Sequence, residues 1–327
     1  MAKVTVLMAV YNAAPYLNEA VQSVLRQTLH DVELICVDDF SSDGSRNLLA
    51  DWQNADSRVR VISLKRNMGQ AVARNIALCE ATGEYVCMLD ADDWLSDDAL
   101  ERAVEVLDRD SEVDSVLFDV EFVYPDGGRK PYVMPDFSRM DGMTAFRLSL
   151  TWTIHGLYMI RAGLHKRYPY DTTCRLYSDD NTTRVHYLAS RNVGHCHGVY
   201  HYRQHPKSAT HGVHVLRFDY LKANESMART IRRLGLDRDI QAEYENVRWL
   251  NLVDTFKFYY CNHQRLGERG RRYGLWTLRN YWRTIDRSML SRRTVAKFGY
   301  WPTPSWKLFC IQEWTYFTLR SLLGRNQ

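Results

Sequence analysis

Residues 85–95 read YVCMLDADDWL, a short apolar run that ends in three aspartates and a tryptophan. Such a run is typical of a buried strand. Three similar runs come earlier in the chain: KVTVLMA (3–9), VELICV (32–37) and VRVISL (59–64). Apolar residues at helical spacing separate the runs, over residues 17–25, 45–53 and 72–77. This alternation predicts an α/β fold with a parallel sheet and helices on both faces, through about residue 124.

Polar side chains follow these strands where each strand ends. Tyr11 comes after the first strand, Asp39 after the second, and Asp90 opens an Asp-x-Asp-Asp string after the fourth. In sheets of this kind ligands bind beyond the carboxyl ends of the strands. We therefore expect the chemistry of the chain at that edge of the sheet.

Asp90, Asp92 and Asp93 place three carboxylates at one strand end. Their mutual repulsion favours a bound cation, and a hard divalent metal would usually also hold the phosphates of a substrate. The alternative is that these acids only cap the helix after Trp94. We expect that helix to begin near Ser96, whose hydroxyl can cap it.

Four segments, in this order and at these spacings, form a wider pattern: VLMAVYNAAPYL (6–17), VELICVDDFSSDGS (32–45), NMGQAVARNIAL (67–78) and YVCMLDADDWL (85–95). Together they resemble family 2 of the inverting glycosyltransferases, over roughly residues 3–120. The resemblance implies the GT-A fold, a Rossmann-like, mostly parallel sheet flanked by helices. It also implies transfer of a sugar from a nucleotide-diphosphate donor to an acceptor hydroxyl.

The resemblance assigns the donor site residue by residue. The backbone at Ala9 and the ring of Tyr11 would hold the base, and Asp39 would hydrogen-bond its edge. Arg74 would approach the diphosphate, and Asp90 would face the ribose or the metal. A UDP-sugar is the expected donor, although Asp39 alone does not distinguish uracil from guanine or thymine.

The same resemblance assigns the metal and the catalytic base. Asp92 would be the principal ligand of Mn²⁺ or Mg²⁺, with Asp93 as a further candidate. LYSDDNTTRVHYL (176–188) resembles the family's Glu-Asp segment, so Asp180 would take the proton from the acceptor hydroxyl. Because this chain has Asp179-Asp180 where the family has Glu-Asp, Asp179 stays a second candidate for the base.

Several histidines cluster near the end of the resemblance. They lie in GHCHGVYHYRQH and comprise His195, His197, His201 and His205, together with Cys196. The cluster invites a zinc site, but its alternation is typical of a strand and no Cys-x-x-Cys lies nearby. YHYRQHPKSAT (200–210) resembles the family's Tyr-Arg-x-His-x-x-Ser segment, so Arg203 and His205 are candidates to approach the metal or the diphosphate. A purely structural His205 is the alternative.

The resemblance implies a transferase domain over residues 1–215, with a nucleotide-sugar half over residues 1–124 and an acceptor half over residues 125–215. Composition predicts a helical, basic, aromatic-rich region over residues 216–327. Residues 124–141 are rich in Pro, Gly and charge and predict a long loop. His155, beside Trp152, is a candidate for acceptor binding, and a core histidine is the alternative.

Basic charge is concentrated at the C-terminus. Residues 265–327 hold thirteen Lys and Arg against three acids, and five of the nine tryptophans. Arginines mixed with large aromatic rings suit an anionic bilayer surface, and residues 298–323 are the best candidate segment. A packed helical appendage with a solvated basic face and a nucleic-acid surface are the alternatives.

The seven cysteines, several of them in apolar segments, suit a reducing compartment. Since no secretory leader opens the chain and no run of eighteen apolar residues occurs in it, we expect a cytoplasmic protein, peripheral at the inner face of the membrane. The expected partners are a nucleotide-sugar donor and a glycan or lipid-linked oligosaccharide acceptor in surface polysaccharide synthesis, with no nucleic acid.

Two rival functions use similar residues. A metal-dependent nucleotidyltransferase would want a Gly-rich, basic phosphate loop after the first strand, where this chain has VYNAAPYL. A catalytically inactive nucleotide-sugar or glycan-binding protein would not need the complete set of aspartates. A dinucleotide oxidoreductase is disfavoured because no Gly-x-Gly-x-x-Gly follows the first strand.

Overall fold

The computed structural model describes residues 2–205, 212–296 and 298–324. The chain forms two compact units, one of Met1–Thr172 with Ser178–Pro206 and one of Thr173–Tyr177 with Lys207–Gln327. The division at residue 215 stays a prediction, because the second of these units also contains Thr173–Tyr177. Residues 206–210 of the YHYRQHPKSAT segment lie outside the described residues.

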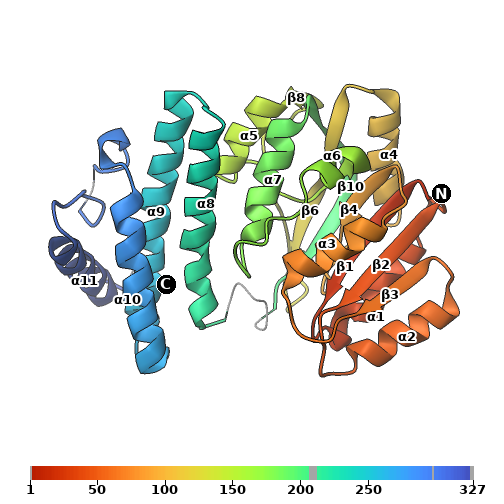
Figure 1. Cartoon of the computed structure of the whole chain (residues 1–327), viewed down its shortest axis with the longest axis horizontal. Coiled ribbons are helices and arrows are strands. Elements are labelled where there is room, and N and C mark those ends of the chain that lie inside the picture. The colour runs from red at the N-terminus through yellow and green to blue at the C-terminus, as the bar shows by residue number, and fades with distance from the viewer. Residues whose placement is uncertain (1, 206–211, 297, 325–327) are drawn as a thin grey trace. The chain divides into compact units, whose positions relative to one another are not determined.

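The first unit contains one mixed sheet, several strands of which are labelled in Figure 1. The sheet has the strand order β3-β2-β1-β4-β9-β6-β10-β5. Its first half is parallel and consists of β1 (Val4–Val10), β2 (Val32–Asp38), β3 (Val59–Ser63) and β4 (Tyr85–Met88). The helices α1 (Ala14–Leu25), α2 (Ser45–Ala55) and α3 (Gln70–Glu80) connect them. The predicted alternation of strands and helices is confirmed here.

The second half of the sheet changes direction. β9 (Tyr158–Arg161) pairs antiparallel with both β4 and β6 (Val113–Val123), and β10 (Asn192–Arg203) runs parallel to β6. The helices of this half are α4 (Ala99–Arg109), α5 (Gly142–Leu150), α6 (Ala162–Arg167) and α7 (Ser178–Ala189). Residues 124–141, predicted as a loop, also contain the short strands β7 (Arg129–Pro131) and β8 (Arg139–Asp141).

Ser96 does not cap α4, so that prediction was wrong. The helix begins at Ala99 behind Asp98, and no side chain caps it. The hydroxyl of Ser96 instead accepts a hydrogen bond from the amide of Val199 at 2.9 Å. Ser96 thereby joins β10 to the end of the short strand β5 (Trp94–Leu95), and α4 begins three residues after Ser96.

Apolar strands and helix faces make the core of this unit. Six of the seven residues of β1 are buried, and Leu17, Val21 and Val24 of α1 belong to the same core with no exposed surface. Burial of each such side chain stabilises the fold by about 1.5–3 kcal/mol. The one half-exposed residue of β1 is Ala9, close to the strand's carboxyl end.

The second unit is helical. It contains α8 (Asp219–Arg233), α9 (Arg238–Asn262), α10 (Gly267–Thr284) and α11 (Trp306–Leu322), with 3₁₀ turns at Val215–Phe218 and Arg287–Met289. Gly235 ends α8 in the left-handed conformation that glycine tolerates, at φ 64°. The core of the second unit is largely aromatic and includes Phe218, Trp249, Phe256 and Phe309. Among the described residues, no helix is both long enough and apolar enough to span a membrane.

Candidate active site

The carboxyl ends of β2, β1 and β4 meet at one edge of the sheet. β1 is hydrogen-bonded to both neighbours, with Val10 opposite Asp38 and Leu7 opposite Met88. The residues that follow these strands, Tyr11, Asp39 and Asp90, therefore emerge at the same edge. This is the edge at which the sequence predicted the chemistry.

Asp39 is almost completely buried, and its carboxylate is already engaged. Its two oxygens accept hydrogen bonds from the backbone amides of Met68 at 2.6 Å and Gly69 at 2.8 Å. Asp39 therefore fixes the turn that leads into α3. A nucleotide base would have to use the remaining lone pairs of the same oxygens.

Two aromatic rings lie open beside Asp39. The ring of Tyr11 is 54% exposed, and Phe40, which has a left-handed backbone at φ 67°, is 49% exposed. Exposed rings of this size at a strand end offer a surface for stacking. The sequence analysis named Tyr11 and missed Phe40. The position of Phe40, directly after Asp38-Asp39 at a strand end, could have indicated it.

Arg74 lies fully buried between two carboxylates. Its guanidinium pairs with Asp90 and lies 3.4 Å from a carboxylate oxygen of Asp179, and it also lies over the ring of Tyr170. Gln70, one turn earlier on α3, donates to the same oxygen of Asp179 at 2.9 Å. In this structure the guanidinium of Arg74 joins the end of β4 to the start of α7, and its approach to a diphosphate stays a prediction.

Asp92 pairs with His205. The Nε2 atom of His205 lies 2.8 Å from a carboxylate oxygen of Asp92, and the imidazole also packs against the ring of Tyr16. The side chain of Asp92 is 34% exposed, so it can still be reached from solvent. Burial and the charge of Asp90 raise the pKa of Asp92.

Asp93 has a different environment from Asp92. It is buried, and its oxygens accept hydrogen bonds from the hydroxyl of Tyr200 at 2.9 Å and the amide of Arg203 at 2.7 Å. Burial and the neighbouring carboxylates of Asp90 and Asp92 raise its pKa well above the usual range. Asp93 thus anchors the end of β10, whereas Asp92 is partly exposed to solvent.

Arg203 continues this anchor. Its Nε donates to the carbonyl of Asp92 at 2.8 Å, and its guanidinium lies over the rings of Trp94 and Tyr16 and pairs with Glu19. The charge of Arg203 is therefore already balanced by Glu19 and covered by two aromatic rings.

A divalent cation fits this cluster. Asp90, Asp92 and Asp93 each offer a carboxylate oxygen, and these oxygens lie within 4.8 Å of one another. Crowded carboxylates lose their mutual repulsion when a cation binds between them. His205, which contacts Asp92 and whose side chain is only 10% exposed, adds an imidazole nitrogen, so the donor set suits Mn²⁺ or Mg²⁺ with water in the remaining positions.

Asp179 and Asp180 begin α7 and differ in their partners. Asp179 is held by Arg74 and Gln70, whereas no described residue donates a hydrogen bond to the carboxylate of Asp180. Burial, together with the charge of Asp179, raises the pKa of Asp180 to about 7. A carboxylate of this pKa is poised to accept a proton near neutral pH.

His155 lies apart from these aspartates. It is buried, its Nδ1 accepts from the amide of Leu157 at 3.3 Å, and its ring meets Tyr132 edge to face. Burial lowers the pKa of His155 to about 4, so the ring is neutral. These contacts are those of a core histidine, and Trp152 nearby packs under the guanidinium of Arg184.

The other histidines of the cluster pair with acids on β6. His195 and His197 both contact Asp119, and His201 lies 3.0 Å from Glu121. Cys196 is a buried free cysteine that belongs to the core. The five residues considered for zinc are therefore not gathered at one point.

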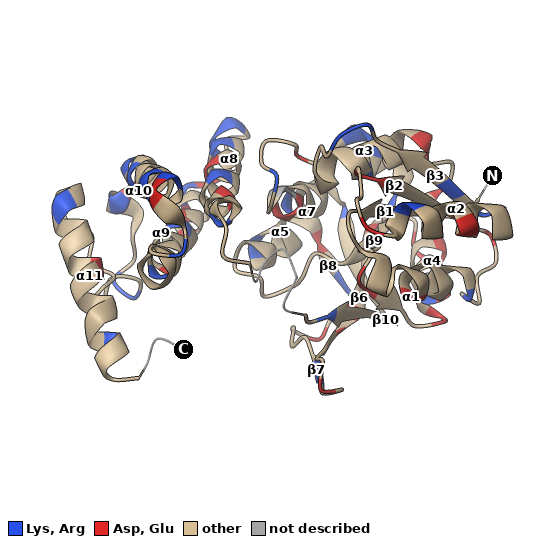
Figure 2. Cartoon of the chain, turned by 90° about the horizontal axis from the view of Figure 1, so that it is seen from below, with Lys and Arg blue, Asp and Glu red and all other residues tan. Residues whose placement is uncertain are grey.

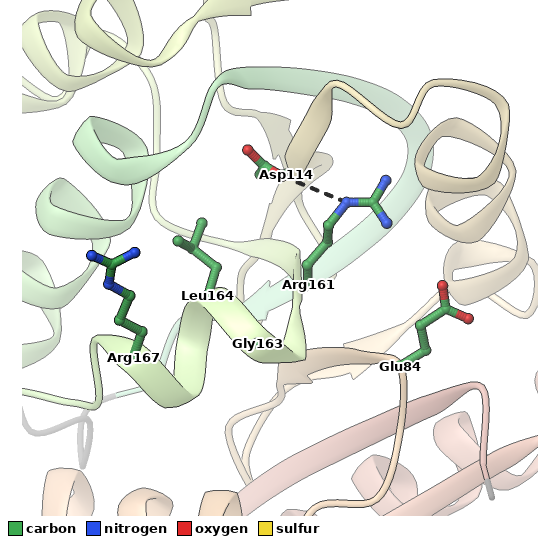
Figure 3. A pocket seen from close by; sticks show the side chains of 6 residues that line it. All are labelled: Glu84, Asp114, Arg161, Gly163, Leu164 and Arg167. Atoms are coloured by element: carbon green, nitrogen blue, oxygen red, sulfur yellow. Dashed lines mark ion pairs between the residues drawn. The ribbon is translucent and has the colours of Figure 1, made fainter.

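The described residues also line a hollow of about 380 Å³ at the opposite edge of the sheet (Figure 3). It is lined by Glu84, Asp114, Arg161, Gly163, Leu164 and Arg167. Arg161 is tied to Asp114 at 3.5 Å and to the carbonyls of Val113 and Leu107. The hollow lies before β4 and at the start of β6, far from the aspartate cluster along both strands.

Sequence comparisons agree with the pattern of motifs. The family model described as glycosyl transferase family 2 matches residues 5–169. The putative teichuronic acid biosynthesis glycosyltransferase TuaG of Bacillus subtilis (strain 168) is 44% identical over 104 residues, which are 32% of this chain and 41% of that protein. The match thus spans less than half of the relative's length.

Solved structures share the fold over nearly the whole chain. S. aureus TarS 1–349 in complex with UDP-GlcNAc has a TM-score of 0.72 and 19% identity, covering 99% of this chain and 92% of that one. The mannosyltransferase PcManGT from Pyrobaculum calidifontis, in complex with GDP-Man and Mn²⁺, has a TM-score of 0.56 and 19% identity, covering 99% and 88%.

Proposed function

Since this chain belongs to glycosyl transferase family 2 and has the GT-A fold, we propose that it transfers a hexose from a UDP-sugar to an acceptor hydroxyl, with inversion and with the help of a divalent metal. The observation that carries the proposal is the joining of two carboxylate groups by Arg74. One group, at Asp90 to Asp93, would serve the donor, and the other, Asp179 and Asp180, would serve the acceptor.

The donor would bind at the carboxyl ends of β1, β2 and β4. The ring of Tyr11 would stack on the base, the backbone at Ala9 would line its edge, and Asp39 would accept from the base while it holds the turn before α3. Asp90 would face the ribose or the metal. A uracil base is supported by the UDP-GlcNAc complex of the similar TarS fold, and guanine is the competing base because PcManGT was solved with GDP-Man.

Asp92 and His205 would hold the metal. Asp93 would keep His205 in place through its hydrogen bond with the amide of Arg203. A divalent cation there would neutralise the charge that develops on the leaving diphosphate. Arg203 and Tyr200 would keep Asp92 and Asp93 in place through the hydrogen bonds at the end of β10.

Asp180 would be the general base. Its carboxylate would accept the proton of the acceptor hydroxyl as that oxygen attacks the anomeric carbon from the face opposite the diphosphate. Asp179 would orient α7 through Arg74 and Gln70. Because the metal and the protein stabilise the leaving group, no covalent intermediate on the enzyme is needed.

The second unit would bring the enzyme to a membrane. On α11, Leu308, Ile311, Leu319 and Leu322 recur on one face and are 47–79% exposed. Figure 2 shows Lys and Arg along α10 and a mostly uncharged α11. An exposed apolar helix face beside arginines suits an anionic bilayer. The acceptor would then be a lipid-linked oligosaccharide or glycan in surface polysaccharide synthesis, a setting supported by the similarity to TuaG.

Flotation with vesicles tests the membrane part. The full chain should float with vesicles that contain an anionic lipid and not with neutral ones, and Ile311→Asp with Leu322→Asp should abolish flotation. Flotation that is unchanged in this double variant would remove α11 from the account. The control is Val133→Asp, at an exposed apolar residue of the other unit.

Release of nucleoside diphosphate tests the chemistry. The chain is incubated with UDP-, GDP- and dTDP-sugars, with and without Mn²⁺ or Mg²⁺, and compared with Asp92→Ala and Asp180→Asn. We expect slow metal-dependent release from one donor that both variants lose. If no donor is cleaved and calorimetry detects no donor binding, the donor site is misassigned. Donor binding without release, even with acceptor extracts, would favour a non-catalytic binding protein.

A further inference from the structure

Three side chains on one face of the sheet converge away from the aspartate cluster. The Nε2 atom of His195 lies 2.9 Å from one carboxylate oxygen of Asp119, and the Nδ1 atom of His197 lies 3.1 Å from the other. The three potential ligand atoms lie within 4.8 Å of one another. The two imidazole rings meet nearly at right angles, with centroids 5.1 Å apart.

Strand geometry explains the convergence. His195 and His197 are two residues apart on β10 and so point to the same side of the sheet. The opposite side faces α4, because a Cβ atom at Gly198 would lie only 2.6 Å from the Cα of Ala99. The register between β10 and β6 shifts between His195 and Val199, and Asp119 lies opposite Val199. The shift brings both rings onto one carboxylate.

We propose that Asp119, His195 and His197 bind a divalent transition-metal ion, Zn²⁺ being the best match. Two imidazole nitrogens and a carboxylate are a common ligand set of zinc sites with an open fourth position. Ligands about 2.0–2.1 Å from a tetrahedral zinc lie roughly 3.3 Å from one another, close to the nitrogen–oxygen distances in this cluster. The metal would replace the two hydrogen bonds that now join one ring to each oxygen of Asp119.

Exposure leaves room for the fourth ligand. The side chain of His195 is only 9% exposed and is covered by Phe137, whereas those of His197 and Asp119 are 75% and 42% exposed. The site is therefore closed on one side and open to water on the other. It differs from the Asp92 cluster, since imidazole ligands favour zinc and carboxylate oxygens favour magnesium or manganese.

The expected consequence is local. Asp119 belongs to β6 and both histidines to β10, so the ion would pin these strands at their register shift. The same strand β10 ends at Tyr200 and Arg203, which hold Asp93. Metal binding would stabilise the folded chain, as binding to the native state alone must.

The test uses the tag-free, chelator-treated full chain with Asp92→Asn, so that the other cation site is weakened. Co²⁺ is titrated in as the probe, and the visible absorption of a four-coordinate Co²⁺ ion is followed before Zn²⁺ displaces it. We expect a single Co²⁺ site that is lost with His197→Asn. His201→Asn is the matched control, because His201 pairs with Glu121 on the same strands without a second histidine.

His197→Asn changes an exposed side chain, so the fold should survive, and circular dichroism checks this. In the parent chain, which carries only Asp92→Asn, Zn²⁺ alone should raise the Tm. It should do the same when His201→Asn is added, and it should leave the Tm unchanged when His197→Asn is added. Absence of the Co²⁺ absorption in the parent chain, or its persistence in His197→Asn, would overturn the proposal. Loss in both variants would do so too, since it would mean that no specific site exists.

Discussion

The Nε2 atom of His205 lies 2.8 Å from a carboxylate oxygen of Asp92, although 113 residues separate them in the chain. The end of β10 thus returns to the end of β4, where the other two aspartates lie. The contact depends on Asp93, which holds the amide of Arg203 two residues before His205. If a metal is bound by both side chains, substitution of either Asp92 or His205 should therefore weaken its binding.

His205→Asn should weaken activation by the metal more than it weakens donor binding. We expect the metal concentration that gives half of the maximal rate to rise by roughly 10–100-fold, the range typical for loss of a group at a metal site. The measurement is the initial rate of nucleoside diphosphate release against Mn²⁺ concentration. His201→Asn should leave the curve unchanged, and an unchanged curve for His205→Asn would take this residue out of the metal site.

The rate should depend on pH through Asp180. A general base must be deprotonated, and the pKa of Asp180 is raised to about 7 by burial and by Asp179. Hence kcat/KM should fall as the pH drops below about 7. Asp179→Asn removes the neighbouring charge, so the acid limb should move to lower pH. Asp110→Asn, at an acid outside the site, should not move it, and an immobile limb in Asp179→Asn would contradict the assignment.

Asp180→Asn should inactivate the enzyme and yet stabilise it in alkaline buffer. A carboxyl group whose pKa is higher in the folded chain than in the unfolded chain lowers stability as the pH rises between the two values. The unfolded value is about 3.9. The variant should therefore have a higher Tm than the native chain at about pH 8, and nearly the same Tm at about pH 4. A lower Tm at the alkaline pH would show that the charged Asp180 stabilises the fold.

Arg74→Met should destabilise the first unit. It removes the buried cation between Asp90 and Asp179 and leaves both carboxylates without their positively charged partner. Removal of one member of a buried ion pair costs about 3–5 kcal/mol. The check is the free energy of unfolding in urea. Arg60→Met, whose shorter ion pair, with Glu80, is exposed, should cost no more than about 1 kcal/mol. Equal losses in the two variants would mean that Arg74 has no special role.

The parallel half of the fold could be predicted because its evidence is local. Each strand is a short apolar run, each helix has an apolar stripe, and the aspartates directly follow their strand in the sequence. The second half lacked such signals. β9 contains only four residues, Tyr158–Arg161, and its antiparallel insertion between β4 and β6 depends on contacts with strands far away in the chain.

The candidate site divides in the same way. The motifs that resemble the family indicated Tyr11, Asp39, Asp92 and Asp180 as site residues, and their roles stay predictions. They did not predict that Tyr200 donates to Asp93 or that Arg74 is buried between two acids, because these contacts exist only once β10, α3 and α7 have packed. Asp119 was missed for the same reason, since its partners His195 and His197 reach it across the sheet.

Equilibrium binding of UDP with and without Mn²⁺ tests the central claim most directly, namely that a cation at Asp92 joins the nucleoside diphosphate to the sheet edge. Calorimetry compares the native chain with Asp92→Asn, and with Asp119→Asn as the control. We predict that Mn²⁺ tightens UDP binding to the native chain and to the control and has no such effect on Asp92→Asn. Tight UDP binding that is indifferent to Mn²⁺, or equally metal-dependent in Asp92→Asn, would contradict the account.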